Sequence, residues 1–240
     1  MPIDPAAFRH HPELIGRIKE PEDSFFRDLD VEEMSRMVVA NGGPANWRYP
    51  DEMREELRRT ALAGRQGDVW VFAYGSLMWD PGIFFHEVRR ARLPGWSRQL
   101  CLVDRFGGRG TPEAPGLMAG LVPGGHCDGL AFRIAASEVE EETEQLFRRE
   151  MLAPCYLPTF TPAETAEGEV EVLAFVADDS TEMIETGLPR QTQIRYIASG
   201  RGTLGTSLEY LAGVVDHFRA FGIHDDELEG LLTEVRTLTA

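Results

Sequence analysis

One glutamate of this sequence, Glu150, stands where an apolar residue would be expected. The stretch from Ser137 to Met151 has helical spacing when each residue is advanced by about 100°. Four side chains then share one face: Val139, Thr143, Leu146 and Phe147. The other acids lie off this face, namely Glu140, Glu141, Glu144 and, at its border, Glu142. Glu150 falls within the apolar stripe, so the helix is predicted to turn one acid inward.

An inward carboxylate at this place has two interpretations. Burial disfavours the charged form and raises the pKa, and the C-terminal end of a helix disfavours negative charge as well. A carboxylate closer to neutrality suits general acid–base catalysis. Alternatively, Glu150 forms a partly buried ion pair with Arg149 or another arginine and has a structural role. Helix geometry alone leaves both open.

A second stretch with chemical potential is the turn after the first strong strand. The β-rich run "VWVFAY" reaches Tyr74 and meets Gly75, Ser76 and Leu77. Glycine lets the backbone turn sharply and approach a ligand closely. Successive N–H groups in such a turn can bind a carboxylate or a developing oxyanion. Most strand–Gly–Ser turns are only turns, so the local sequence does not decide between these roles.

Composition excludes several classes of partner. The 240 residues carry a formal net charge of -16 and contain a single lysine, Lys19. Such an acidic chain repels phosphate backbones and anionic lipid, which argues against nucleic acid and membrane surfaces. One lysine also gives little support to a P-loop or a Schiff base. No apolar run approaches the roughly 20 residues of a membrane-spanning helix. The proline- and charge-rich N-terminus does not resemble a secretory signal, so we expect a cytoplasmic protein.

Metal and disulfide chemistry are not indicated either. The three cysteines, Cys101, Cys127 and Cys155, are not closely paired, and the six histidines offer no HExxH motif. We therefore expect a reaction that needs no metal and no cofactor.

The remaining pattern indicates an α+β protein. Residues 1–67 are expected to form a helical or irregular extension, with helices at "VEEMSRMVVA" and "PDEMREELRRTALAG" and packing through Trp47, Met53 and Leu57. Residues 68–240 are expected to form the main domain. Its predicted strands are "VWVFAY", "GWSRQLCLV", "GLMAGLV", "CDGLAFRI" and "EVEVLAFVA". Capping boxes at Ser137-x-x-Glu140 and Thr206-x-x-Glu209 predict two helix starts, and "DDELEGLLTEVRTL" predicts a last helix.

Taken together, these stretches resemble the ChaC family of γ-glutamylcyclotransferases. The matching segments, in family order, are "VFAYGSLMWDPG", "GWSRQLCL", "GRGTPEAPGLMAGL", "GGHCDGLAFRI", "LFRREMLAPCYLPTF", "VLAFVADD" and "GRGTLGTSLEYL". Each is weak alone, and together they run from about residue 69 to 212. The resemblance implies a compact mixed β-barrel with flanking helices.

The resemblance also implies a reaction and its residues. Glutathione would be cleaved into 5-oxoproline and cysteinylglycine when its α-amine attacks its own γ-carbonyl. The family's catalytic glutamate corresponds to Glu150, which would carry the proton. The substrate-cradling turn corresponds to Tyr74, Gly75, Ser76 and Leu77, and two further tyrosines to Tyr156 and Tyr210. Arg109 would attract an anionic peptide, or is simply a solvated loop arginine.

Three positions depart from the family pattern: Ala73, Pro154 and Ser207. None removes a catalytic group, but Pro154 and Ser207 bear on the roles of Tyr156 and of the late helix. Three alternatives stay open. They are a non-catalytic γ-glutamyl binder of the same fold, a cyclotransferase for other γ-glutamyl amines, and a hydrolase with Cys155 or Ser76 as nucleophile.

Overall fold

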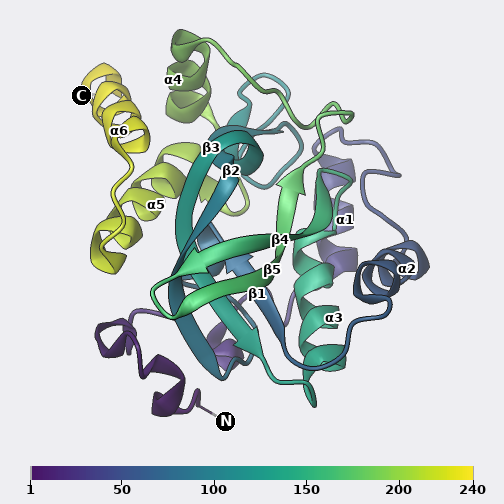
Figure 1. The fold of residues 1–240 in the computed structure, drawn as a ribbon. Helices are drawn as coiled ribbons and strands as arrows, with labels where there is room; N and C mark the ends of the chain where they lie inside the picture. The colour runs from purple at the N-terminus through teal and green to yellow at the C-terminus, as the bar shows by residue number, and fades with distance from the viewer. Residues whose placement is uncertain (1, 240) are drawn as a thin grey trace. The chain divides into compact units, whose positions relative to one another are not determined.

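A computed structural model of the protein describes residues 2–239, which contain a closed five-stranded barrel (Figure 1). The strands are β1 (Val69–Ala73), β2 (Glu87–Asp104), β3 (Gly116–Ile134), β4 (Tyr156–Thr165) and β5 (Gly168–Ala177). Their order around the barrel is β1-β3-β2-β4-β5, and β3 also pairs with β5. The predicted α+β barrel is confirmed.

Strand β1 lies between two partners that close the barrel. It runs antiparallel to β3, with Val69 opposite Ile134, and parallel to β5. Gly129 allows the close approach where β1 ends, because a Cβ there would lie 2.3 Å from the carbonyl oxygen of Ala73. The largest fully buried rings of this core are those of Phe72, Phe132, Phe147 and Phe175.

The helices are α1 (Val31–Ala40), α2 (Asp51–Leu62), α3 (Val139–Glu150), α4 (Arg190–Ser199), α5 (Ser207–Phe221) and α6 (Asp226–Thr239). Short 3-10 turns lie at Pro5–Phe8 (η1), Pro12–Leu14 (η2), Pro21–Asp23 (η3) and Ser76–Met78 (η4). A two-stranded ribbon joins β6 (Arg201–Gly202) to β7 (Gly205–Thr206). Within residues 2–239, every helix is too short or too polar to cross a membrane.

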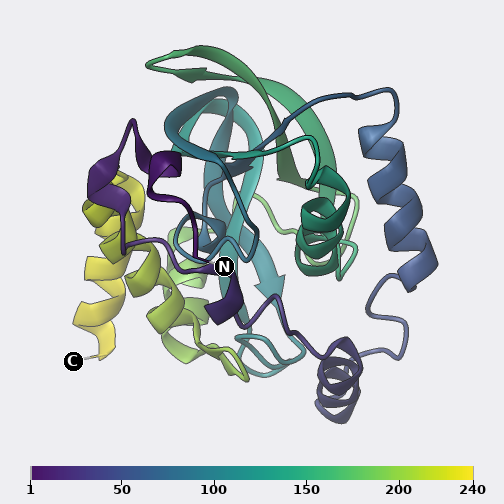
Figure 2. The same cartoon turned by 90° about the horizontal axis from the view of Figure 1, so that it is seen from below.

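The chain divides into two compact units. The first contains Met1–Leu29, Arg48–Arg98 and Leu121–Ala177, and the second contains Asp30–Trp47, Gln99–Gly120 and Asp178–Ala240. Strands β2 and β3 continue from the first unit into the second. In the second unit, α5 and α6 lie side by side (Figure 2). The boundary expected between residues 67 and 68 stays a prediction.

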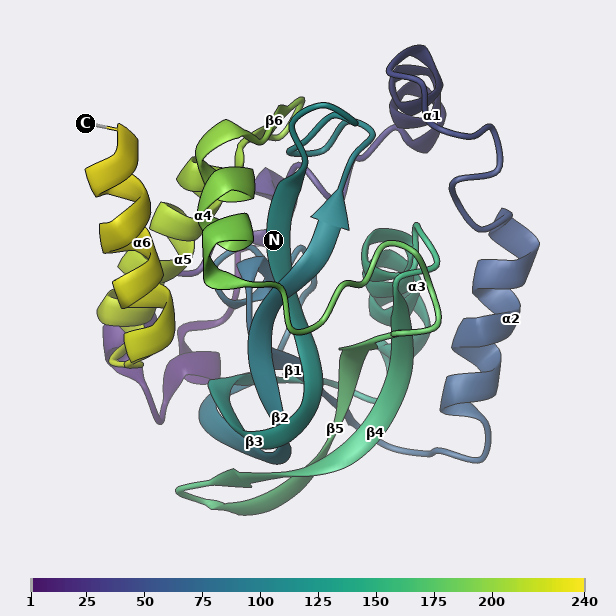
Figure 3. The same cartoon turned by 90° about the horizontal axis from the view of Figure 1, so that it is seen from above.

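In the first unit, α2 packs against α3 (Figure 3). The buried guanidinium of Arg58 on α2 donates to the Glu140 carboxylate at 2.6 Å and to the Thr143 hydroxyl at 3.0 Å. Arg58 is therefore the buried anchor of α2. The expected anchoring through Met53 is wrong, because that side chain is 47% exposed.

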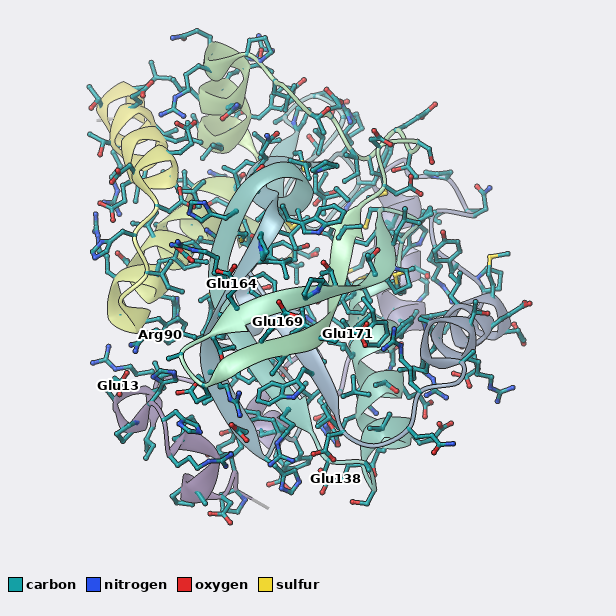
Figure 4. The ribbon with its side chains drawn as sticks, in the orientation of Figure 1. Glu13, Arg90, Glu138, Glu164, Glu169 and Glu171 are labelled. Carbon is teal, nitrogen blue, oxygen red and sulfur yellow. The ribbon has the colours of Figure 1, made fainter. Side chains whose placement is uncertain are left out.

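The N-terminal turns are attached to β2 by charged groups. Arg90 on β2 pairs with Glu13 at 2.8 Å, and its backbone N–H donates to Nε2 of His11 at 3.0 Å (Figure 4). The acids of the β4–β5 hairpin are also visible there, with Glu164 and Glu169 directly opposite each other. Like charges at such a position repel, so this hairpin is held by its backbone pairing and its buried residues.

The sequence-based elements are mostly confirmed, and the main differences are the following. The two strands expected at 116–122 and 127–134 are one strand, β3, and strand β4 and helix α4 were not predicted. The capping box at Ser137 is wrong: α3 begins at Val139 with Glu138 at the N-cap and no side-chain cap, and the Glu140 carboxylate binds Arg58. The capping box of Thr206 and Glu209 at α5 is confirmed.

Candidate active site

Helix α3 presents its last residue, Glu150, on the side that packs against the barrel. Leu146 and Phe147 are buried, and the Phe147 ring meets Phe175 of β5 edge-on, with centroids 5.3 Å apart. Glu150 follows one turn later, and its side chain is only 14% exposed. The apolar face and the inward carboxylate predicted from the sequence are confirmed.

Glu142 was expected at the border of that face and is in fact fully buried. Its carboxylate accepts from both terminal nitrogens of Arg27, at 2.9 and 3.1 Å, and from the Phe84 backbone N–H at 2.9 Å. A buried carboxylate is tolerated when it is paired in this way. The helix therefore turns two acids inward, and the sequence pattern identified only Glu150.

The Glu150 carboxylate is paired with the neighbouring arginine. Nε of Arg149 lies 2.9 Å from Oε1 of Glu150, and the Arg149 side chain is 5% exposed. Burial raises the pKa of Glu150, and the nearby positive charge of Arg149 only partly opposes that rise. The acid is therefore both ion-paired and raised in pKa, and its catalytic role stays a prediction.

The same guanidinium connects Glu150 to the Tyr-Gly-Ser-Leu turn. Nη2 of Arg149 donates to Oγ of Ser76 at 2.9 Å, and Nη1 donates to the backbone carbonyl of Asp80. The inward carboxylate and the turn are therefore two ends of one hydrogen-bonded chain. Neither helix spacing nor turn composition predicts this hydrogen-bonded link. The adjacent Arg149 and Glu150 at the end of the helix were the sequence feature that could have indicated it.

The turn itself is held from the barrel side. Nε of Arg98 donates to the carbonyl of Tyr74 at 2.7 Å, and the Tyr74 hydroxyl donates to the carbonyl of Phe175 at 2.9 Å. In a planar trans peptide the C=O and N–H point in opposite directions. Because Arg98 binds the Tyr74 carbonyl, the Gly75 N–H points away from Arg98. The Met78 N–H closes the turn on the Gly75 carbonyl at 2.9 Å.

The remaining predicted residues are divided between the two units. Tyr156 is the first residue of β4, opposite Ala177, and is buried in the first unit together with Tyr74 and Leu77. Arg109 and Tyr210 lie in the second unit.

Arg109 and Tyr210 form a local pair. The Arg109 guanidinium carbon lies 5.0 Å from the Tyr210 ring centroid, and Nη1 donates to the Thr206 carbonyl at 3.1 Å. Burial lowers the pKa of Arg109, with the surrounding Tyr210 and Glu209 opposing the change. The interpretation of Arg109 as a solvated loop arginine is wrong. The Tyr210 hydroxyl accepts from the Ala119 backbone N–H at 3.2 Å.

Among residues 2–239, no group of three or more histidine, cysteine, aspartate or glutamate side chains is placed to hold a metal. All three cysteines are buried free thiols, and burial raises the pKa of Cys101 to about 11.

Comparison with known proteins gives consistent matches. The family model described as ChaC-like protein matches residues 69–238. The chain is 38% identical over 192 residues to the glutathione-specific gamma-glutamylcyclotransferase of Escherichia coli (strain K12), covering 79% of this chain and 83% of that protein. It is 30% identical to glutathione-specific gamma-glutamylcyclotransferase 1 of Mus musculus, covering 71% of this chain and 79% of that protein. A crystal structure of a gamma-glutamyl cyclotransferase specific to glutathione from yeast has a TM-score of 0.63 at 20% identity, covering 72% of this chain and 100% of that chain.

Proposed function

Because the chain belongs to the ChaC-like protein family, we propose that it is a γ-glutamylcyclotransferase that converts glutathione into 5-oxoproline and cysteinylglycine. Family membership supports the reaction, and one observation of the structure supports its residues. A nearly enclosed carboxylate, Glu150, has a raised pKa and is joined through Arg149 to the turn at Ser76.

The reaction needs a proton carrier and a folded substrate. A reference α-amine has a pKa near 8 and is largely protonated at neutral pH, so it must lose one proton before it can attack. The second proton leaves as the amine nitrogen bonds to the γ-carbonyl carbon. Glu150 takes that proton and delivers it to the cysteinyl nitrogen as the old C–N bond breaks. A raised pKa suits a group that must both accept and release a proton near neutrality.

The Tyr-Gly-Ser-Leu turn is proposed to orient the substrate. Backbone N–H groups of Gly75, Ser76 and Leu77 would hold its carboxylate or the oxygen of the reacting carbonyl. Binding that holds the substrate amine next to its own γ-carbonyl excludes the extended conformers that cannot react. Such orientation gives a large increase in the rate of intramolecular reactions. Arg98, by fixing the Tyr74 carbonyl at 2.7 Å, sets the direction of the first of these N–H groups.

Tyr156 and Tyr210 are proposed as substrate-binding residues from the family resemblance, and Arg109 is proposed from its positive charge. Arg109 adds a cation, and its stacking on Tyr210 fixes its orientation. Such a group suits a peptide carboxylate.

A second candidate function, a non-catalytic γ-glutamyl binder, has less support, because such a protein has little reason to bury the Glu150 carboxylate. A hydrolase with Ser76 as nucleophile has less support. The Ser76 hydroxyl accepts from Arg149, a cation that cannot remove its proton.

The deciding experiment is incubation with glutathione and a few γ-glutamyl dipeptides, followed by mass spectrometry for 5-oxoproline. We expect 5-oxoproline and cysteinylglycine in equal amounts from glutathione. Thermal stabilisation by glutathione without 5-oxoproline would instead identify a binder. Turnover of the dipeptides but not of glutathione would move the assignment to other γ-glutamyl amines.

A further inference from the structure

Residues 19–29, here called the N-terminal segment, contact both halves of the candidate active site. The segment lies outside residues 69–238, which match the family model, but belongs to the first compact unit. Its contacts reach the chain just after the Tyr-Gly-Ser-Leu turn and the helix that carries Glu150.

On the turn side, the segment is bound at three successive places. The Lys19 N–H donates to the Trp79 carbonyl at 2.8 Å, and Nζ of Lys19 pairs with Oδ2 of Asp80 at 3.1 Å. Nη1 of Arg27 donates to the Gly82 carbonyl at 3.1 Å. A Cβ at Gly82 would lie 3.0 Å from Oγ of the buried Ser24, so the segment is in direct contact with the chain that follows the turn.

On the helix side, the contacts are charged. Arg27 binds Glu142 of α3 through both terminal nitrogens, at 2.9 and 3.1 Å. One turn and a half later, Nη2 of Arg148 donates to the carbonyl of Leu29. A bidentate arginine–carboxylate pair fixes orientation as well as distance. Arg27 thus holds the segment to the helix and to the chain that follows the turn at once.

Phe26 touches the residue that joins these two halves. The guanidinium carbon of Arg149 lies 3.8 Å from the centroid of the Phe26 ring. The edge of the same guanidinium donates to Ser76, Asp80 and Glu150. A planar cation held on one face by a ring and along its edge by three acceptors has one orientation.

We propose that Phe26 is a positioning residue for the cyclotransferase reaction: its ring fixes the Arg149 guanidinium, which in turn sets the Glu150 carboxylate against the Tyr-Gly-Ser-Leu turn. This inference rests on the proposed role of Glu150. It makes the N-terminal segment a working part of the active site, through contacts that the family-matched residues do not supply.

The test is Phe26→Leu, which keeps an apolar side chain but removes the ring face. We expect kcat to fall about threefold to tenfold with little change in KM, in line with the strength of a partly desolvated cation–π contact. Arg149 lowers the pKa of Glu150 against burial, so a loosened Arg149 lets that pKa rise. A base works in its deprotonated form, so the acid limb of the kcat profile should move to higher pH.

Two further variants separate positioning from general packing. Phe26→Tyr keeps the ring and should restore kcat and the acid limb. Phe25→Leu is the matched control for the loss of a neighbouring ring: Phe25 is 54% exposed, meets the Phe26 ring only edge-on with centroids 5.5 Å apart, and should tolerate the change. Wild-type kcat and pH profile in Phe26→Leu would overturn the proposal, as would an equal loss in Phe26→Tyr or Phe25→Leu.

A measurement that does not depend on catalytic activity tests the positioning role of Phe26 separately from the proposed function. The Glu150 carboxylate can be followed by 13C NMR of side-chain-labelled glutamate, and its signal is identified by its loss in Glu150→Gln. We expect its titration to move to higher pH in Phe26→Leu and to be unchanged in Phe25→Leu. An absence of 5-oxoproline from wild-type protein would refute the proposed function, whereas an unmoved titration would refute the positioning role.

Discussion

Replacing Glu150 by glutamine is the most direct test of the proton carrier. The amide has the same heavy-atom shape and can still accept from Nε of Arg149, now 2.9 Å from Oε1. It cannot take a proton from the substrate amine. Removing a general acid–base group typically costs 10²- to 10⁴-fold in rate. Glu150→Gln should therefore raise the barrier by about 3–5 kcal/mol, at ~1.4 kcal/mol per factor of ten.

The same substitution makes a separate prediction about stability. The pKa of Glu150 is raised in the folded protein because burial outweighs the attraction of Arg149. Between its ordinary pKa of 4.5 and the raised value, the folded state binds more protons than the unfolded state. Glu150 therefore makes its full contribution to the stability of the folded state below pH 4.5, and this contribution is lost as pH rises through the raised pKa.

Glutamine is neutral and avoids the cost of burying an ionised carboxylate. Glu150→Gln should therefore melt within about 4 °C of the wild type at pH 7, a difference in the free energy of unfolding of roughly 1 kcal/mol for a chain of this size. The difference between mutant and wild type should become more favourable to the mutant as pH rises from 4.5.

The assay is the initial rate of 5-oxoproline release from glutathione, measured by mass spectrometry, with thermal unfolding followed in parallel. Glu144→Gln is the matched control, because Glu144 lies on the exposed side of the same helix. It should leave the rate and the melting temperature unchanged. A Glu150→Gln protein that folds normally and keeps a near wild-type rate would refute the assignment of Glu150. Melting far below the wild type at pH 7 would show that the ion pair with Arg149 outweighs burial.

Three further outcomes are expected. Arg149→Lys should lower kcat about tenfold or more, because one ammonium cannot serve Ser76, Asp80 and Glu150 together; a wild-type rate would contradict the link between helix and turn. Ser207→Ala should lower the melting temperature by about 2–10 °C, because the fully buried Ser207 hydroxyl accepts from the N–H of Leu117 at 2.9 Å and donates to its carbonyl at 3.0 Å. Calorimetry measures this melting temperature. An unchanged value would show that the two hydrogen bonds contribute nothing to stability. Exhaustive chelation should leave the rate unchanged, and activity that is lost and returns with added zinc would contradict a metal-free reaction.

The sequence predicted those elements that are determined by residues close together in the chain. The apolar stripe of α3 follows from helical spacing, and the Thr206–Glu209 cap from two residues three apart. Strand β4 was missed because Pro158 and Pro162 interrupt its pattern, and a proline supplies no N–H to a sheet. In β3, the glycines after Pro123 suggested a break that the strand does not have.

The site was predictable only in part, for a different reason. The inward position of Glu150 is a property of one helix, and the sequence contains it. The partners that tune the site come from far away in the chain: Arg27 meets Glu142 across 115 residues, and Arg149 meets Ser76 across 73. Hydrophobic periodicity carries no information about pairs so far apart in the sequence. The burial of Glu142 and the contacts of the N-terminal segment are therefore seen only in the three-dimensional structure.

The solitary lysine of the sequence has a practical consequence. Nζ of Lys19 lies against Asp80, yet its side chain is 44% exposed and open to reagents. Reductive methylation with 13C-formaldehyde would label one side-chain amine in the whole protein, beside the turn proposed to receive the substrate. The Lys19 resonance, distinguished from that of the methylated α-amine by its absence in a Lys19→Arg protein, would serve as an internal probe of whether the chain around residue 19 stays docked while ligand comes and goes.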